Sequence, residues 1–246
     1  MLKTFLMILV NFLTTLRILG VVCLLPIYGR YGGVAAALLS IGCYFTDCLD
    51  GIIARKCHVA TFFGSFYDGL SDKLFTVANL VLLFTITKYA IFPILCEIAI
   101  VTIQSIKFSK NANVKSSKIG KLKTWIISLT VIIVYLISDI MNITFLPINF
   151  VNSIISINDQ LLYGVVFIPL YIFEVLTLLS YLTFKNENGS INAIEFSKIN
   201  IKLKKSKNFK DKWHNFCLLW FNNDFYEKYK DSAGLKEIRK YVKNNR

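Results

Sequence analysis

The stretch FTDCLDGIIARKCHVATFFGSFYDGLSDK, residues 45–73, places charged groups in a chain that is otherwise mostly apolar. It holds half of the eight acidic residues that precede Lys185, namely Asp47, Asp50, Asp68 and Asp72. Long apolar runs flank it on both sides. A charged side chain at membrane depth costs at least about 2.5–3.5 kcal/mol on insertion scales, so a group of four indicates a functional site.

Composition sets the class of protein. The 246 residues are 55% hydrophobic and 17% charged, and the mean hydropathy is +0.55, which is typical of a membrane protein. A helical span of the bilayer core needs about 20 apolar residues. Six stretches approach that length: Phe5–Ile27, Gly33–Ala54, Lys73–Thr87, Tyr89–Ile106, Thr124–Met141 and Leu161–Phe184. The sequence therefore predicts an all-α integral membrane protein with six transmembrane helices, the third of which is short unless it begins inside the aspartate stretch.

Two other interpretations of these runs are weaker. A large soluble helical protein rarely contains so many apolar runs of this length. A cleaved signal peptide at the amino terminus is disfavoured because Arg17 interrupts the first run and five more spans follow. We therefore expect the first run to be a retained helix.

The distribution of Lys and Arg predicts the orientation. The loops after the second and fourth spans hold two and six of these residues, whereas the three opposite connections together hold two. Because Lys and Arg concentrate in cytoplasmic loops, we expect both termini, the Arg55–Thr61 turn and the Lys107–Lys123 loop to be cytoplasmic. The site indicated by the four aspartates would then face the cytoplasm from the inner (cytoplasmic) membrane. The net charge of +13 fits this topology and anionic headgroups, and no recognition module indicates a nucleic-acid partner.

A change in composition near Phe184 divides the chain. Residues 1–184 form the predicted six-helix membrane domain, and residues 185–246 form a basic tail with 15 Lys or Arg against seven acidic residues. Aromatic and apolar residues recur in the tail at helical spacing: Trp213, Phe216, Cys217, Trp220 and Phe221. Such a basic amphipathic helix suits the membrane interface, and it equally suits a cytosolic face of the protein or of a partner.

The spacing of the aspartates predicts a metal site. Asp47 and Asp50 are three residues apart and Asp68 and Asp72 are four apart, so each pair lies on one face of a helix. The intervening KCHVATFF supplies a turn, which allows two antiparallel helices to bring the carboxylates together. Crowded carboxylates need a cation, and Mg²⁺ or Mn²⁺ are hard cations that prefer oxygen ligands. Helix caps and surface charges are the plainer interpretation, and they fit Asp68 and Asp72 better than they fit all four.

The same residues resemble a known signature. Asp47-x-x-Asp50-Gly51-x-x-Ala54-Arg55, eight residues, Gly64, three residues, Asp68, three residues and Asp72 match every position of the pattern of the CDP-alcohol phosphatidyltransferase family. The resemblance covers roughly residues 1–184 and implies a two-metal site held by Asp47, Asp50, Asp68 and Asp72. It also implies that Asp72 takes a proton from an acceptor hydroxyl, which attacks the β-phosphate of a CDP-linked lipid and displaces CMP.

The resemblance further implies residues that bind the CDP-lipid. Gly51, Arg55 and Thr61 belong to this group, and the segment NFLTTLR adds Asn11 and Thr14 because it is similar to an Asn-x-x-Thr segment of bacterial members. An ordinary interfacial polar residue is an equally good interpretation of Asn11.

The acceptor is predicted from a different segment. SSKIGKLKT, Ser116–Thr124, resembles a segment of the phosphatidylglycerophosphate synthases of that family, in which Lys121 and Lys123 would meet the phosphate of glycerol 3-phosphate. Topology alone also explains two lysines in a cytoplasmic loop. The chain departs from the family pattern at Gly69, where proline is usual, and at Cys96, where arginine precedes the glutamate.

Several alternatives stay open at this point. The substrates implied are CDP-diacylglycerol and a small alcohol phosphate, most simply glycerol 3-phosphate. Inositol phosphate, serine, phosphatidylglycerol, choline or ethanolamine would use the same chemistry. A divalent-cation transporter is the alternative from another class, although its carboxylates belong near the bilayer midplane. The sequence leaves a homodimer open.

Overall fold

The computed structural model describes residues 2–109, 118–143, 147–157, 159–183 and 208–229. These residues form helices and connections, without a strand in the described ranges. The helices are α1 (Leu2–Lys56), α2 (Phe62–Ile86), α3 (Ile91–Ser109), α4 (Lys118–Ser138), α5 (Ile148–Ile155), α6 (Asp159–Thr183), α8 (Phe209–Trp220) and α9 (Asn223–Tyr229). Short 3₁₀ turns occur at Lys88–Ala90 and Ile140–Asn142.

Five of the described helices are long and apolar enough to cross a membrane: α1, α2, α3, α4 and α6. The first of these spans 54 residues and contains the first two predicted spans. The third predicted span is longer than expected, because α2 begins eleven residues before Lys73, inside the aspartate stretch. The short helix α5 lies in a connection for which the sequence predicted no helix. The predicted domain boundary at residues 184 and 185 lies outside the described ranges.

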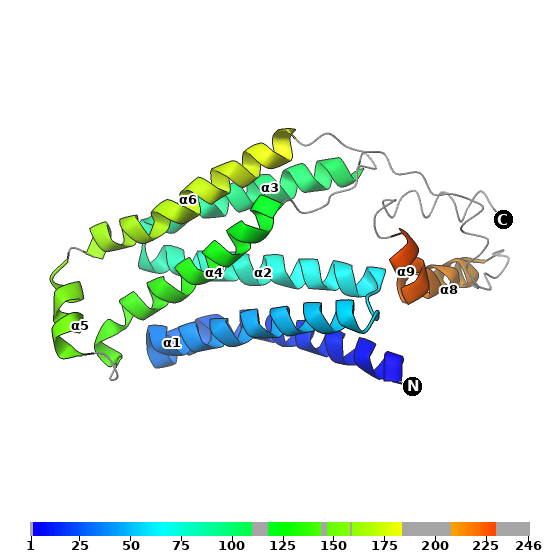
Figure 1. The fold of residues 1–246 in the computed structure, drawn as a ribbon, viewed down its shortest axis with the longest axis horizontal. Helices are drawn as coiled ribbons and strands as arrows, with labels where there is room; N and C mark the ends of the chain where they lie inside the picture. The colour runs from blue at the N-terminus through cyan, green and yellow to red at the C-terminus, as the bar shows by residue number, and fades with distance from the viewer. Residues whose placement is uncertain (1, 110–117, 144–146, 158, 184–207, 230–246) are drawn as a thin grey trace.

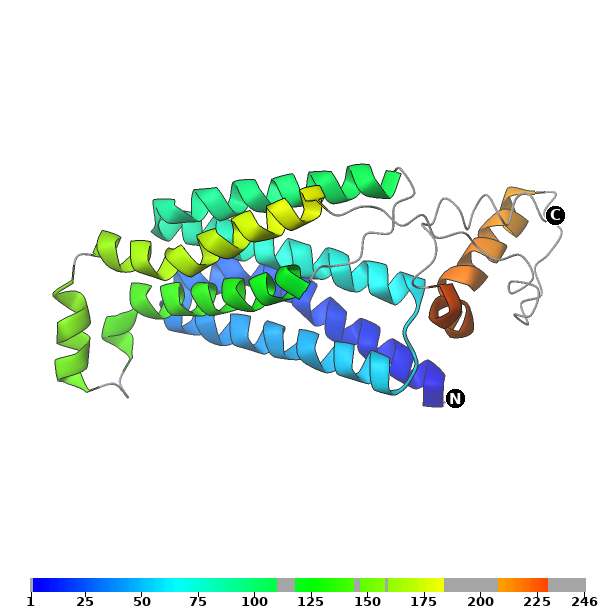
Figure 2. The same cartoon turned by 45° about the horizontal axis from the view of Figure 1, so that its top comes forward.

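The helix α1 doubles back at Gly32, so its two arms lie side by side (Figures 1 and 2). Gly32 has φ 81° and ψ −172°, a conformation that side-chain-bearing residues rarely adopt. A carboxylate just after the end of α4 caps the start of the second arm, since the Val34 N–H donates to Asp139 Oδ2 at 3.1 Å. A negative charge there also suits the positive end of the second arm's helix dipole. The sequence Tyr31-Gly32-Gly33 thus marks the reversal.

Within the bundle, two helices each contact three others: α2 packs against α1, α3 and α4, and α4 packs against α1, α2 and α6. The helix α6 also packs against α3. A buried polar contact ties three of these helices together: Asn79 Oδ1 accepts from Ser40 Oγ at 3.1 Å and from the Tyr135 hydroxyl at 3.0 Å. Such hydrogen bonds hold helices together where water cannot compete. The apolar core around them includes Leu83, Val134 and Phe167.

The outside of the bundle is apolar. Large side chains such as Val22, Leu25 and Leu38 are each more than 60% exposed. A soluble monomer rarely exposes so large an apolar surface, whereas lipid tails solvate it without penalty. Together with the long apolar helices, this surface identifies an integral membrane protein.

The tail helices α8 and α9 pack on the beginning of α2, at the same end of the bundle as the amino terminus (Figure 1). The ring centroid of Phe63 lies 4.8 Å from that of Phe221 and 6.3 Å from that of Trp220. The side-chain amide of Asn223 donates to the Ala60 carbonyl at 2.7 Å. The described part of the tail thus packs on the protein itself, and a position at the membrane interface stays a prediction.

The close approach at Gly33 yields a stability prediction. A Cβ on this residue would overlap the Tyr135 carbonyl oxygen, which is backbone and cannot rotate away. We therefore expect Gly33→Ala to lower the free energy of unfolding by about 1–3 kcal/mol, as overpacking generally does. Thermal unfolding in detergent measures this loss of stability.

The matched control is Gly29→Ala, because a Cβ there meets nothing within 4 Å. Alanine has the higher helix propensity, so this variant should be at least as stable as the parent. Equal melting midpoints for the two variants would contradict the proposed close approach.

Candidate active site

A buried arginine lies among the carboxylates of the aspartate stretch. Arg17, from the first arm of α1, is 1% exposed. Its Nη2 lies 2.6 Å from Asp47 Oδ1 and 3.1 Å from Asp50 Oδ2, both from the second arm. Its Nη1 lies 3.1 Å from Asp68 Oδ1 on α2 and also donates to the Ser71 hydroxyl. One guanidinium therefore joins three helical segments.

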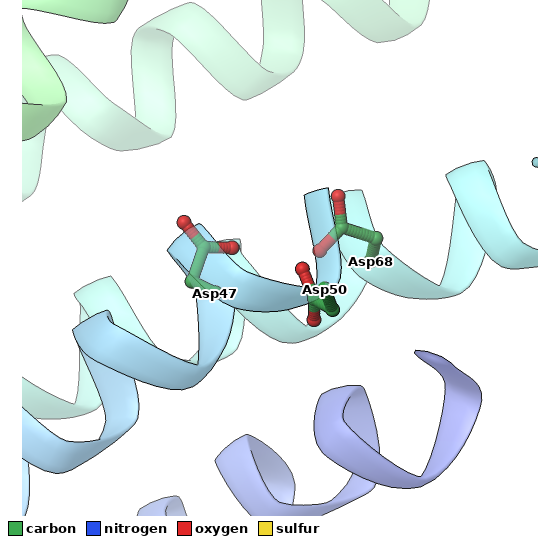
Figure 3. A group of neighbouring side chains, drawn as sticks. All are labelled: Asp47, Asp50 and Asp68. Atoms are coloured by element: carbon green, nitrogen blue, oxygen red, sulfur yellow. The ribbon is translucent and has the colours of Figure 1, made fainter. Parts of the chain in front are cut away.

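The three carboxylates fit the oxygen-rich donor set of a divalent cation. Asp47, Asp50 and Asp68 each offer a ligand atom, and these atoms lie within 4.8 Å of one another (Figure 3). Arg17 occupies one oxygen of each carboxylate, and each keeps a second oxygen that can serve as a ligand. Carboxylate oxygens are the ligands that Mg²⁺ and Mn²⁺ prefer. The convergence of these three side chains was predicted from their spacing, whereas Asp72 does not belong to the group.

A cavity of about 250 Å³ opens beside this group. Asp50 and Asp68 line it together with all five residues that the resemblance assigned to the CDP-lipid: Asn11, Thr14, Gly51, Arg55 and Thr61. The Thr14 hydroxyl donates to Asp50 Oδ2 at 3.2 Å. We call this space the donor cavity; its ligand remains a prediction.

Local structure explains why these residues meet. Thr61 caps α2, because its hydroxyl accepts from the Gly64 N–H at 3.0 Å. A Cβ at Gly64 would lie 3.4 Å from the Asn11 amide oxygen and 3.2 Å from the Thr61 hydroxyl. Gly64 thus lies in contact distance of both the cap residue and the first arm of α1.

A second cavity, of about 200 Å³, holds the remaining predicted site residues. Asp72, Lys121 and Lys123 line it, together with Lys73 and Glu97. Asp68 and Asp72 are one helical turn apart on α2, and each lines a different cavity. We call this second space the acceptor cavity.

The two predicted acceptor lysines differ in environment. Lys123 is buried, forms an ion pair with Glu97 and lies 3.7 Å from Glu174 Oε2. Glu97 also pairs with Lys73 at 3.2 Å. Lys121 is exposed, and within the described ranges no carboxylate lies at ion-pair distance from it. Of the two lysines, Lys121 is therefore the one whose ammonium group is not paired with a carboxylate among the described residues.

Three charged residues of these networks were missed by the sequence interpretation, which assigned no role to Arg17, Glu97 or Glu174. Their signal was present, because each is an ionisable residue inside an apolar span, and such residues generally pair within the bundle. Their ion-pair partners lie 24 to 51 positions away, and no local spacing identifies them.

Comparison with known proteins agrees with this geometry. Residues 7–155 match the family described as CDP-alcohol phosphatidyltransferase. The chain belongs to this family. The match includes the three-carboxylate group and ends before α6, α8 and α9.

Relatives share shorter stretches. Over 96 residues the chain is 32% identical to the CDP-diacylglycerol–glycerol-3-phosphate 3-phosphatidyltransferase of Bacillus subtilis. The matched stretch covers 37% of this chain and 50% of the relative. Over 97 residues it is 35% identical to the protein of the same name in Wigglesworthia glossinidia brevipalpis, covering 36% and 53%. Over 57 residues it is 44% identical to a cardiolipin synthase (CMP-forming) of Oryza sativa, covering 23% and 17%. The chain thus spans about half the length of the two bacterial relatives.

The position of Arg17 predicts a metal-dependent stability. Of its three partners Asp50 is the buried one, and removal of one member of a buried ion pair is destabilising because the other charge stays buried and unpaired. Arg17→Gln leaves three carboxylates without their cation, so we expect it to unfold at a lower temperature in chelator. Added Mn²⁺ should restore more stability to this variant than it adds to the parent, because the ion replaces the lost charge. Thermal unfolding with and without Mn²⁺ measures both effects.

Arg30→Gln is the control, because Arg30 is exposed near the Gly32 reversal, far from the carboxylates. It should melt like the parent under both conditions. A loss of stability in Arg17→Gln that Mn²⁺ does not reduce would count against a cation site at these carboxylates.

Proposed function

We propose that this protein transfers a phosphatidyl group from CDP-diacylglycerol to glycerol 3-phosphate and releases CMP. The observation that carries the proposal is the pair of cavities on either side of one turn of α2. The donor cavity contains Asp50 and Asp68, and the acceptor cavity contains Asp72 and Lys121. Two substrates bound in these cavities would meet at the aspartates, which favours direct transfer between them.

The chemistry follows from the residues at that meeting point. Asp47, Asp50 and Asp68 would hold Mg²⁺ or Mn²⁺, and such an ion would supply charge neutralisation for a diphosphate and for the attacking and leaving oxygens. Asp72 lies outside the three-carboxylate group, so its principal role in the proposal is that of the base. Its carboxylate takes the proton of the acceptor hydroxyl, whose oxygen forms a bond to the β-phosphorus while the bond to CMP breaks. A further role of Asp72 as a metal ligand remains a prediction.

The acceptor cavity supports an acceptor that carries a phosphate. Lys73, Lys121 and Lys123 line it, and Lys121 adds a positive charge that Glu97 does not already neutralise. Ammonium groups are good point-charge partners for phosphate. Serine, choline and ethanolamine carry no phosphate and would leave this charge unused. The names of the bacterial relatives also specify glycerol 3-phosphate.

The proposed topology has six spans, with α1 crossing the membrane twice. At 1.5 Å per residue a straight helix of 54 residues would extend about 80 Å, far more than a bilayer core of about 30 Å. The reversal at Gly32 supports two crossings instead. Both termini and the turn between α1 and α2 would then be cytoplasmic, with the site facing that side of the inner membrane.

Cysteine labelling of intact cells tests this topology. The native Cys57 is exposed in the turn between α1 and α2, and Asn149 is exposed on α5 at the other end of the bundle (Figure 1). With the other cysteines replaced, we expect an impermeant thiol reagent to label Asn149→Cys from outside and Cys57 only after permeabilisation. Labelling of both from the same side would refute the arrangement.

An acceptor panel tests the reaction. With purified protein and CDP-diacylglycerol, we expect CMP release to require glycerol 3-phosphate and Mg²⁺ or Mn²⁺, and to stop in excess chelator or in Asp50→Asn. Lys121→Ala should raise the KM for glycerol 3-phosphate about ten- to a hundredfold, the cost of one charge-assisted contact of about 1.5–3 kcal/mol, with little change in the KM for CDP-diacylglycerol.

Lys88→Ala is the control for the lysine variant, because Lys88 is exposed in the 3₁₀ turn before α3 and lines neither cavity. It should leave both KM values unchanged. CMP release with inositol phosphate or serine, and not with glycerol 3-phosphate, would reject this acceptor and keep the donor chemistry.

A further inference from the structure

One wall of the donor cavity comes from the tail. Tyr226, on α9, lines this cavity together with Thr61, Gly64 and Asp68. The family match ends at residue 155, so α9 lies beyond the part of the chain that the family shares. The donor cavity of this protein is therefore completed by a residue that the family comparison does not cover.

The contacts of α9 hold Tyr226 in that position. The Asn223 amide donates to the Ala60 carbonyl at 2.7 Å, which fastens the first turn of α9 to the turn before α2. Phe225 is fully buried, with its ring 5.5 Å from that of Phe62. The Tyr226 ring meets the same Phe62 ring edge to face, at 5.1 Å and 76°. These contacts fix the tyrosine at the edge of the cavity.

The point at which Tyr226 contacts α2 lies at a distance from Asp68 that suits the base of a CDP-lipid. Phe62, which Tyr226 contacts, precedes Asp68 by six residues, or about 9 Å along the helix axis. A base is separated from its β-phosphate by a ribose and a second phosphate. With the diphosphate at Asp50 and Asp68, a base that extends within this cavity toward Thr61 would reach Tyr226. The cavity, at about 250 Å³, is below the roughly 300–1,000 Å³ typical of drug-sized ligands, which suits the nucleotide end alone.

We infer that Tyr226 stacks on the cytosine base of the CDP-lipid, so that the tail forms part of the donor site. The inference rests on the proposed function. Aromatic side chains stack on the π-face of a base, which stabilises the complex without requiring a base-specific hydrogen bond. The aspartates then bind the diphosphate, and α9 supplies affinity for the nucleoside.

Binding of CMP to the full-length protein tests the inference. Removal of a stacking ring should weaken CMP binding about five- to a hundredfold, so we expect that loss in Tyr226→Ala and CMP affinity close to the parent in Tyr226→Phe. Tyr226→Leu keeps an apolar contact with Phe62 and lacks the π-face, so it should lose CMP affinity while melting like the parent. In turnover, the KM for CDP-diacylglycerol should rise in the Ala and Leu variants, with the KM for the acceptor unchanged.

The control is Trp213→Ala, because Trp213 is an aromatic residue of α8 that is 59% exposed and does not line the donor cavity. It should bind CMP like the parent. CMP affinity that is unchanged in Tyr226→Leu, or equally reduced in Tyr226→Phe and Tyr226→Ala, would overturn the stacking role.

The two proposals fail differently in this experiment. If the parent protein binds CMP and releases it from CDP-diacylglycerol while Tyr226→Ala behaves identically, only the role of the tail is wrong. If the parent neither binds CMP nor turns over CDP-diacylglycerol with any acceptor, the proposed function fails and the stacking role fails with it.

Discussion

Three carboxylates within 4.8 Å repel one another, and the burial of Arg17 among them is the constraint on which the site depends. The arginine lies 15 residues before Gly32 and Asp47 lies 15 residues after it. At 1.5 Å per residue, both side chains are about 22 Å from the reversal, which brings them level on the two arms of α1. The glycine turn therefore sets the register in which the charges meet. An insertion in either arm would rotate one partner away as well as displace it along the axis.

The helix α2 contributes one carboxylate to each of the two cavities. Its first turns contribute Asp68 to the donor cavity, and the next turn contributes Asp72 to the acceptor cavity. Because the helix is rigid over this length, the two carboxylates keep a constant separation while their surroundings differ. The first arm of α1 contributes Asn11 and Thr14 to the donor cavity. Each of the two cavities therefore has its own set of charged residues.

The acceptor side is balanced by a second charge network. Glu97 on α3 pairs with Lys73 on α2 and with Lys123 on α4, and Lys123 also lies near Glu174 on α6. Four helices thus share buried charge at one point. Both oxygens of Glu174 lack a hydrogen-bond partner among the described residues, so Lys123 is its only cation within ion-pair distance there. Lys123 thus lies between two carboxylates, whereas Lys121, which lines the same cavity, forms no ion pair among the described residues.

The sequence by itself determined the membrane class, the antiparallel pairing of the aspartate helices and the convergence of Asp47, Asp50 and Asp68. These are consequences of local periodicity and of a turn a few residues long, so neighbouring positions contain the information. The five residues that the resemblance assigned to the CDP-lipid line one cavity, and their binding role stays a prediction. Only the tertiary structure assigned Arg17 to the carboxylates, Lys123 to Glu97 and Glu174, and α9 to the donor cavity. Each of those contacts joins segments far apart in the chain, and their register depends on the Gly32 reversal and on how α3, α4, α6 and the tail pack. An amphipathic or charged pattern specifies that a side chain needs a partner, and packing decides which partner it meets.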